Sequence, residues 1–502
     1  MGNSLPTVWL SPRTLKGSSP CSICLVRMRI TWLISISSPS TMHLGENISG
    51  CALVSNGSTS SALPDSSVPF YTASWGRPAW DPADLLRSLV VMVLAGETSI
   101  SDWVELMRAE PLYAVLSGFA PDKVPGVGTF YDFMDRLVGS APASCRRATR
   151  RLTPLRKREL REAKRRPSRK HEAIVARIAE ALRDEDGHWA PLAAERTVNQ
   201  VLTNLCVRPA VEQGVLPETV GVSGDGTKVA TYANGYGRKD CECAERQCGC
   251  PRRFADPQAS TGYDAFHSRF VHGHTLYSLT AWSLRSKTEL PIYLMRATGR
   301  RSDAVLGPLA LARARQVVPL QIQCACFDGA HDAAAFYDLG QHWGIPLIIP
   351  LGGAPPHNTK DKLARDPDGT PLCMAGRRMY PDGYQKAGRR NRWRCPLKKG
   401  PERGDVRSCE HCSDCSTARS GRIVYTYPGK DARLNCVPAR GSLGWKLLYN
   451  HRTASERTFS RQKVNLRLAQ TRTRGGNRWL FRELLAAIAH HLIVWDQHQP
   501  TT

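Results

Sequence analysis

The sequence predicts an α/β protein whose mixed sheet is preceded by an all-α domain and interrupted by a cysteine-rich segment. Three observations support this fold class. Residues 66–145 carry apolar residues at helical spacing, residues 215–351 alternate between β-prone and helical segments, and residues 352–445 are rich in Pro, Gly, Arg and Cys without a sustained period. Residues 446–502 are helical again and are expected to return the chain to the α/β part.

The N-terminal part begins with residues 1–65, which are rich in Ser, Pro, Gly and Thr. We expect this extension to be poorly ordered, or to result from a wrongly chosen start codon. Residues 66–145 should hold three short helices joined by tight turns, the first capped by Asp81 or Asp84. This pattern fits a DNA-binding domain of the helix-turn-helix type and a plain helical bundle equally well.

Charge points to a nucleic acid as the partner. The 502 residues have a net charge of +25, and the run from Arg146 to Lys170 holds thirteen Lys or Arg and two Glu. This run opens a basic linker with helices, residues 146–214, and favours phosphate contacts over a merely solvated linker. An anionic membrane surface is the second choice, but no stretch reaches about 18 apolar residues, so a membrane span is not expected.

Residues 215–351 read in the order β-β-β-α-β-α-β, which predicts a mixed sheet. The expected strands are "TVGVSGDG", ending at Asp225, then "HTLYSLTAWSL", "LPIYLMRATG", "PLQIQCACFDG", ending at Asp328, and "IPLIIPL". The expected helices are "DAVLGPLALARARQ" and "DAAAFYDLGQHWG", the second closed by Gly344.

Asp225 and Asp328 are candidate metal ligands because each is expected to end a strand and each is followed by Gly. Strand ends converge at the edge of an α/β sheet, and Mg²⁺ takes a few carboxylates, waters and phosphate oxygens as ligands. Two such ions about 4 Å apart support phosphodiester chemistry. For either residue alone an ordinary Asp-Gly turn is the better interpretation, but the pair on the first and fourth strands favours a site.

A third carboxylate lies in the stretch "LYNHRTASERTFSRQK". Between Lys446 and Arg482, Glu456 is the single acidic residue among ten Lys or Arg. With about 100° per residue, one face of a helix, within roughly 60°, holds Tyr449, Arg452, Glu456 and Lys463. Such a face would carry Glu456 to a metal ion and the basic residues to DNA phosphates, whereas the simpler alternative makes Glu456 a salt-bridge partner.

The motifs "SGDGTKV", "CFDGAHD" and "YNHRTASERTFSRQK" resemble those of DDE-type transposases of bacterial insertion sequences, in the group marked by a Tyr-Arg-Glu-Lys signature. The stretch "FADPQASTGYDAFHSRFVHGHTLYSL" is similar to these proteins as well, and "GRPAWDPADLLRSLVVMVLAGETSISDW" resembles their helical N-terminal domain. The resemblance runs from about Arg77 to about Trp495.

The resemblance implies an RNase H-like catalytic core in two parts, residues 215–351 and 446–502, split by the Cys-rich insertion at 352–445. Asp225, Asp328 and Glu456 would take the triad roles and hold Mg²⁺ or Mn²⁺. The protein would bind the terminal inverted repeats of its element as double-stranded DNA, cut there, and join the ends to target DNA as a homodimer or higher multimer in a synaptic complex. DNA contacts would come from Tyr449, Arg452, Arg461 and Lys463, with Tyr449 stacking on a base.

One departure from the family pattern lies in the second motif. The position three residues after Asp328 is often Tyr in these proteins, and here it is His331. The sequence therefore does not determine which groups surround Asp328, and Asp332 is a weaker competing ligand.

The 17 cysteines favour metal sites or free thiols in a reducing compartment over a disulfide framework. Cys395, Cys409, Cys412 and Cys415 are candidate ligands of a structural Zn²⁺, with unligated thiols as the alternative. An earlier group, Cys241, Cys243, Cys248 and Cys250, fits zinc and unligated thiols about equally.

Taken together, we expect a transposase that is cytoplasmic and nucleoid-associated in a bacterium and does not contact membranes. The alternative is a catalytically inactive or repurposed DNA-binding protein derived from a transposase, and a structure-specific nuclease is a weaker third choice. The presence of all three carboxylates favours an enzyme.

Overall fold

The computed structural model describes residues 79–139, 145–147, 169–184, 189–239, 241–244, 250, 252–265, 267–283, 287–353, 362–401, 403–404, 409–416 and 418–498. The predicted N-terminal extension and most of the basic run 146–170 lie outside these residues. No described helix is long and apolar enough to cross a membrane.

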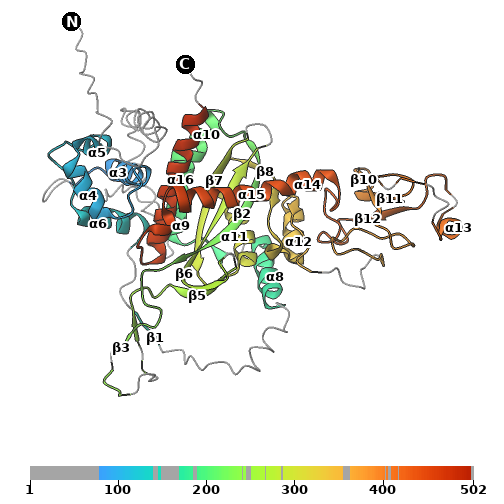
Figure 1. Cartoon of the computed structure of the whole chain (residues 1–502), viewed down its shortest axis with the longest axis horizontal. Coiled ribbons are helices and arrows are strands. Elements are labelled where there is room, and N and C mark those ends of the chain that lie inside the picture. The colour runs from blue at the N-terminus through green and yellow to red at the C-terminus, as the bar shows by residue number, and fades with distance from the viewer. Residues whose placement is uncertain are drawn as a thin grey trace, which may run out of the picture.

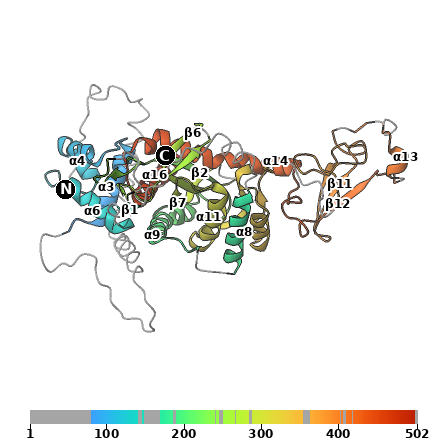
Figure 2. The same cartoon turned by 90° about the horizontal axis from the view of Figure 1, so that it is seen from below.

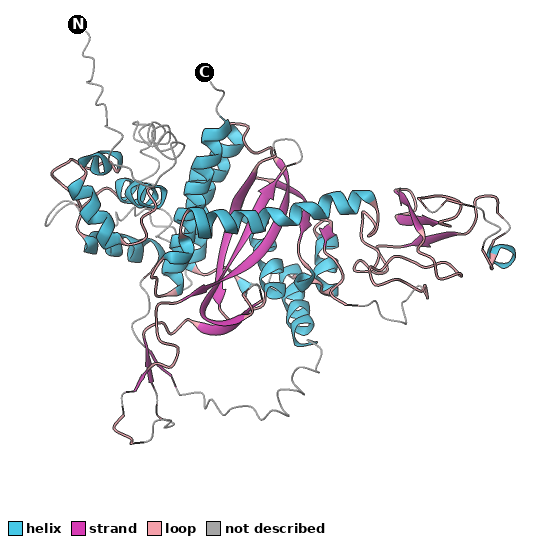
Figure 3. Cartoon of the chain, in the orientation of Figure 1, coloured by secondary structure: helices cyan, strands magenta, loops and turns pink. Residues whose placement is uncertain are grey.

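A mixed sheet lies at the centre of the molecule (Figure 3). Its central strand β2 (Thr219–Ala230) pairs antiparallel with β6 (Arg269–Trp282) and parallel with β8 (Gln321–Cys326). Strand β9 (Leu347–Ile348) continues the sheet beyond β8, and β5 (Ser260–Asp264) and β7 (Glu289–Thr298) pair antiparallel with β6. Helices α11 (Asp303–Val317) and α12 (Ala334–His342) lie between β7, β8 and β9 as predicted, but the sheet has one strand more than the predicted β-β-β-α-β-α-β order, because β5 precedes β6.

The prediction that the first strand ends at Asp225 is wrong. Strand β2 continues to Ala230, because β6 offers backbone partners along this whole length, from Asp225 opposite Ser278 to Ala230 opposite Gly273. The Asp-Gly pair therefore does not turn here, since the ladder supplies more hydrogen bonds than an isolated turn would. The prediction for the strand before Asp328 is nearly right, because β8 ends at Cys326, two residues before Asp328.

Helices cover both faces of the sheet. Figure 2 shows α14 (Leu443–Tyr449) and α16 (Gly476–His498) on one side and α8 (Arg169–Arg183) with α11 on the other. Helix α15 (Thr453–Ser460) crosses the first face over β2, β6 and β7 (Figure 1). Helix α9 (Ala193–Leu202) packs on β7 and α16, and its Asn199 exchanges hydrogen bonds with the backbone of Leu294 in β7.

The N-terminal part folds into α3 (Pro82–Leu94), α4 (Ile100–Ala109), α5 (Pro111–Leu116) and α6 (Val127–Val138). Asp81 caps α3 by accepting from the N–H of Ala83, and Pro111 separates α4 from α5 because the residue before a proline avoids the helical region. Helices α3 and α6 pack on α16, and they share one continuous hydrophobic core with the sheet; Phe133, for example, meets Phe481 edge to face.

Two small sheets extend away from this body (Figure 1). Strands β1 (Cys145–Arg147), β4 (Arg252–Phe254) and β3 (Arg238–Lys239) form an arm that the sequence did not predict. Strands β10 (Tyr380–Gln385), β11 (Arg390–Arg394) and β12 (Ile423–Thr426) form the second sheet, next to the short helix α13 (Cys412–Cys415). This second sheet lies within the Cys-rich insertion.

A buried carboxylate ties the end of β2 to the segment that leads into α16. Oδ2 of Asp256 accepts hydrogen bonds from Thr231 Oγ1 at 2.6 Å, His274 Nε2 at 2.9 Å and the N–H of Gly475 at 2.9 Å. Burial alone would raise the pKa of Asp256, but the bonds from His274 and Thr231 outweigh it and hold the pKa well below its usual range. The motif "FADPQAS" therefore has a structural explanation, because its Asp joins three segments of the chain.

We expect Asp256→Asn to lower the free energy of unfolding by roughly 2–4 kcal/mol. The side-chain NH₂ group of Asn donates hydrogen bonds, and it would face groups that now donate to the carboxylate. Chemical denaturation measures this. The matched control is Asp102→Asn, an exposed position on α4 that should change stability little.

The same network predicts how stability changes with pH. The folded pKa of Asp256 lies below its unfolded value of 3.8, so its contribution is complete above about pH 4 and is lost as the pH falls further. The wild type should therefore lose stability below pH 4 more steeply than Asp256→Asn does. Parallel curves for the two proteins would contradict this account.

Candidate active site

The register of two parallel strands places Asp225 and Asp328 at the same level. Ser223 of β2 is opposite Cys326 of β8. Asp225 follows Ser223 by two residues, and Asp328 follows Cys326 by two residues. Side chains alternate along a strand, so Asp225 shares a face with Thr227, which is the face that α15 crosses. The two predicted metal ligands are therefore brought together, although Asp225 lies within its strand.

Negative charges crowd around Asp225, which is half-buried. Burial raises the pKa of Asp225 to about 7, and the carboxylates of Asp303 and Asp328 add to the rise. The N–H of Gly226, which donates to Oδ1 at 2.8 Å, and the ring of His331 act in the opposite direction. A bound cation would remove this repulsion, so the donor set fits a hard divalent ion.

A hydrogen-bonded chain holds Asp328 in place. Its carboxylate meets His331 Nδ1 at 2.6 Å, and His331 Nε2 meets the hydroxyl of Tyr277 at 2.8 Å. Burial alone would raise the pKa of Asp328, but the bond and charge of His331 outweigh it and lower the pKa. The departure from the family pattern at His331 thus supplies a buried ring that orients the carboxylate.

A fourth carboxylate, Asp303, lies beside this pair and was missed by the sequence analysis. It is the first residue of α11, and its side chain fills the place where a Cβ on Gly226 would be. Its Oδ1 is buried and has no hydrogen-bond partner among the described residues. Burial raises the pKa of Asp303, while His331 and Lys228 oppose the rise. In the sequence it looked like an ordinary acidic residue at a helix start.

Helix α15 is held on the sheet by a residue just before its start and by one near its middle. The ring of His451 stacks on Trp282 of β6 with centroids 4.1 Å apart and planes at 7°. Arg457 forms an ion pair with Glu289 at the start of β7. Ala454 is completely buried between them, so the helix lies directly on the strands.

Glu456 lies on this helix and faces Arg452, with which it forms an ion pair. Its side chain is 47 % exposed. Burial raises the pKa of the neighbouring Tyr449, and the charge of Arg452 opposes the rise. Glu456 is therefore a salt-bridge partner of Arg452 in this structure.

The predicted single helical face is not continuous. The chain forms a 3₁₀ turn at Asn450–Arg452, the α-helix α15, and then a π-helical turn at Arg461–Asn465. Lys463 is consequently directed to β2, where its Nζ donates to Thr227 Oγ1 at 2.9 Å. Arg461 approaches His490 Nε2 at 3.0 Å.

Two further predicted residues have partners of their own. Tyr449 stacks on Trp445, with centroids 4.8 Å apart. Asp332, the competing ligand, accepts from Arg433 Nε at 2.8 Å and Nη2 at 2.6 Å and from the N–H of Gly352 at 2.7 Å. This pairing gives Asp332 a structural role at the base of the Cys-rich segment.

Three thiols of the first cysteine group lie close together. Among the described residues, one group of three metal-ligating atoms lies mutually within 4.8 Å, and it consists of the thiols of Cys241, Cys243 and Cys250. The triad carboxylates do not form such a group in this structure. For the second cluster, the side chain of Cys412 lies outside the described residues, so zinc there stays a prediction.

The mixed sheet, with Asp225 in β2, Asp328 just beyond the end of the parallel strand β8, and a helix laid over the strands, is consistent with an RNase H-like domain. Residues 372–494 match a family model described as "Transposase DDE domain". No curated protein matches the chain. The family match confirms the resemblance to DDE-type transposases; it covers Glu456 and part of the Cys-rich segment, while Asp225 and Asp328 precede it. Bacterial origin and the signature group stay predictions.

Asp303→Asn is expected to stabilise the metal-free protein by about 1 kcal/mol at pH 8, because it removes a negative charge that repels Asp225. Since the pKa of Asp225 is about 7, the gain should vanish near pH 5, where Asp225 is protonated. Denaturation in EDTA at both pH values tests this. Asp122→Asn, an exposed position, should show no such difference, and a loss of stability in Asp303→Asn at pH 8 would refute the repulsion.

Proposed function

We propose that this protein is a transposase that binds the terminal inverted repeats of an insertion sequence, cleaves the DNA there and transfers the ends to target DNA. The observation that carries the proposal is that Asp225, in β2, and Asp328, two residues beyond the end of the parallel strand β8, reach the same level of a sheet that the helix bearing Glu456 crosses. The transposase family match over residues 372–494 supports the same reading. Such an enzyme would act as a homodimer or higher multimer, in the bacterial cytoplasm and on nucleoid DNA.

Asp225, Asp328 and Glu456 would hold Mg²⁺ or Mn²⁺. The buried, unpartnered oxygen of Asp303 and the raised pKa of Asp225 support a cation there, because both describe negative charge without compensation. Such ions, when bound, supply activation of a water or a 3′-hydroxyl and stabilisation of the leaving oxygen. His331 would keep Asp328 ionised and oriented through its 2.6 Å hydrogen bond.

The DNA strand would lie along α15 and the turn that follows it. Arg452 and Lys463 flank the carboxylates, and Arg461 extends the basic line. Tyr449, whose half-buried ring stacks on Trp445 and has the Arg452 guanidinium 5.7 Å from its centre, would add an aromatic contact to a base. Catalysis of this type depends mainly on positioning and on charge stabilisation, which rigid strands and a clamped helix provide.

The alternative is a DNA-binding protein derived from a transposase that no longer cleaves. The ion pair of Glu456 with Arg452 is the observation that favours it, because the third carboxylate faces an arginine. The two functions differ in one measurable property, which is metal-dependent cleavage.

Incubation with Mg²⁺ or Mn²⁺ and DNA that carries the inverted repeats flanking the reading frame should give cleaved and joined products with the wild type. Glu456→Gln should lower the cleavage rate by at least about a hundredfold while it still binds the DNA, because it removes a metal ligand and keeps the shape. Gel analysis measures both steps.

The control variant is Glu212→Gln, an exposed carboxylate outside α15, which should leave cleavage unchanged. Absence of cleavage by the wild type would favour the inactive DNA-binding protein. Equal cleavage by wild type and Glu456→Gln would remove Glu456 from the triad.

We further propose a structural zinc ion, for which the arm formed by β1, β3 and β4 is the better supported place. Three thiols within 4.8 Å of one another suit Zn²⁺, and the Sγ atoms of Cys243 and Cys250 are 3.5 Å apart. The arm is too small to bury a core of its own, so a metal would stabilise it. The second cluster, at Cys395, Cys409, Cys412 and Cys415, stays a candidate for another zinc.

Metal analysis of the purified protein separates these zinc sites. Cys243→Ser should lower the zinc content by about one ion per chain, because a three-thiolate site loses a ligand. Cys415→Ser tests the second cluster in the same way, and Cys373→Ser is the control outside both. An unchanged zinc content in Cys243→Ser would refute the site on the arm.

A further inference from the structure

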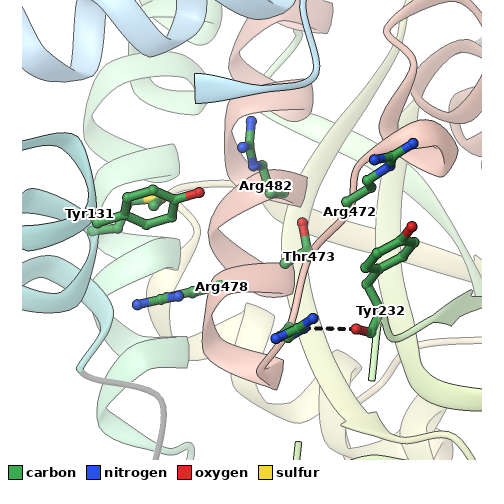
Figure 4. A pocket seen from close by; sticks show the side chains of 8 residues that line it. Tyr131, Tyr232, Arg472, Thr473, Arg478 and Arg482 are labelled. Atoms are coloured by element: carbon green, nitrogen blue, oxygen red, sulfur yellow. Dashed lines mark hydrogen bonds between the residues drawn. The ribbon is translucent and has the colours of Figure 1, made fainter. Parts of the chain in front are cut away.

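A polar cavity lies apart from the carboxylates, between α6, the segment that follows β2, and the start of α16 (Figure 4). Its volume is about 360 Å³. No acidic residue lines it, and four of its eight lining residues are arginines: Tyr131, Met134, Tyr232, Arg472, Thr473, Arg474, Arg478 and Arg482. A concave surface of this composition attracts anions.

Arg482 is the unusual member of this set. Arg482 is only 8 % exposed, and its Nη1 is buried without a hydrogen-bond partner in the described part of the chain. Burial lowers the pKa of Arg482 to about 10, with the nearby Tyr131 acting slightly in the opposite direction. A buried guanidinium without a partner is costly, so the fold bears a penalty here that a bound anion would remove.

The other three arginines are held at the rim by interactions that leave the cavity positive. Arg478 is paired with Asp135, Nη2 to Oδ2 at 2.9 Å, and its guanidinium lies 5.2 Å from the ring centre of Tyr131. Arg472 lies over the ring of Tyr232 at 5.3 Å. Arg474 Nε donates to the backbone oxygen of Tyr232 at 2.7 Å, drawn as a dashed line in Figure 4. A single carboxylate thus offsets one of four positive charges.

We propose that this cavity is a second DNA-binding site that holds a backbone phosphate of the same duplex, away from the reacting bond. The guanidinium of Arg482 offers planar donors to a phosphate, and the rings of Tyr131 and Tyr232, 38 % and 54 % exposed, offer faces to the adjoining nucleotide. The choice of DNA as the source of the phosphate rests on the proposed function.

The geometry of β2 supports one DNA molecule at both places. The strand carries Asp225 and ends five residues later at Ala230, two residues before Tyr232. At about 3.3 Å per residue the two sites are separated by roughly 20 Å, which is on the order of six base pairs. A duplex longer than this therefore has the length to reach from the cavity to the carboxylates.

The test measures binding of a fluorescent duplex of about 30 base pairs and arbitrary sequence by full-length protein in EDTA, over a range of KCl concentrations. Arg482→Met should weaken binding about tenfold and reduce the slope of log K against log salt by about 0.9, because one phosphate contact is lost. Without DNA, Arg482→Met should melt at the same temperature as the wild type or higher, since it removes an uncompensated buried charge.

Two further variants keep the test decisive. Arg472→Gln, at the exposed rim, should reduce the slope in the same direction and covers the case in which Arg482→Met does not fold. The matched control is Arg315→Gln, which should leave the slope unchanged. Arg315 is an exposed arginine of α11 whose guanidinium lies over the ring of Trp343.

Several outcomes would overturn the proposal. A lower melting temperature with unchanged DNA binding would make Arg482 structural, and an absence of duplex binding by the wild type would exclude the site. A third outcome would assign the cavity to a free anion. In it, inorganic phosphate stabilises the wild type but not Arg482→Met, while the two proteins show the same slope of log K against log salt for DNA binding. Because EDTA prevents cleavage, a positive result here stands even if the cleavage test with Glu456→Gln fails.

Discussion

Parallel pairing between β2 and β8 is the constraint on which the rest of the site depends. It sets Asp225 and Asp328 at one level, and every other group is positioned relative to these two strands. Asp303 enters from α11 on one face, and α15 lies over the other. The hydrogen bonds of the sheet thus hold like charges together that would separate in a flexible loop.

This arrangement lowers the stability of the fold in a way that points to function. Burial, together with the charges of Asp303 and Asp328, raises the pKa of Asp225 to about 7. A similar imbalance of opposite sign occurs at Arg482, whose Nη1 is buried without a partner. Sites that bind ions commonly carry such uncompensated charge in the free protein, because the ligand completes the balance.

The sequence predicted the order of elements because hydrophobic periodicity and strand composition are local signals, as in the run "LPIYLMRATG" that became β7. It placed Asp225 at a strand end, since the Asp-Gly pair is locally turn-like and the partner strand β6 is distant in sequence. Asp303 was missed for a related reason. An acid at a helix start is ordinary, and only the tertiary packing of α11 on Gly226 gives it a role.

The helix face predicted for Tyr449, Arg452, Glu456 and Lys463 assumed a regular helix. The structure replaces part of it with 3₁₀ and π turns, which direct Lys463 to Thr227. Their cause is tertiary, because Trp282 and Glu289 on the sheet anchor this helix through His451 and Arg457. The arm with Cys241, Cys243 and Cys250 likewise depends on pairing between β3 and β4, which are too short to be recognised from the sequence.

The ion pair between Arg452 and Glu456 has a thermodynamic consequence for the proposed enzyme. A phosphate that takes Arg452 releases Glu456, and a cation that takes Glu456 releases Arg452. The free energy needed to separate the pair is therefore spent once when both ligands bind, and each raises the affinity for the other by the same factor. Under these assignments, one exposed salt bridge couples the binding of substrate and metal by about a factor of two, because an exposed i,i+4 ion pair contributes roughly 0.3–0.5 kcal/mol.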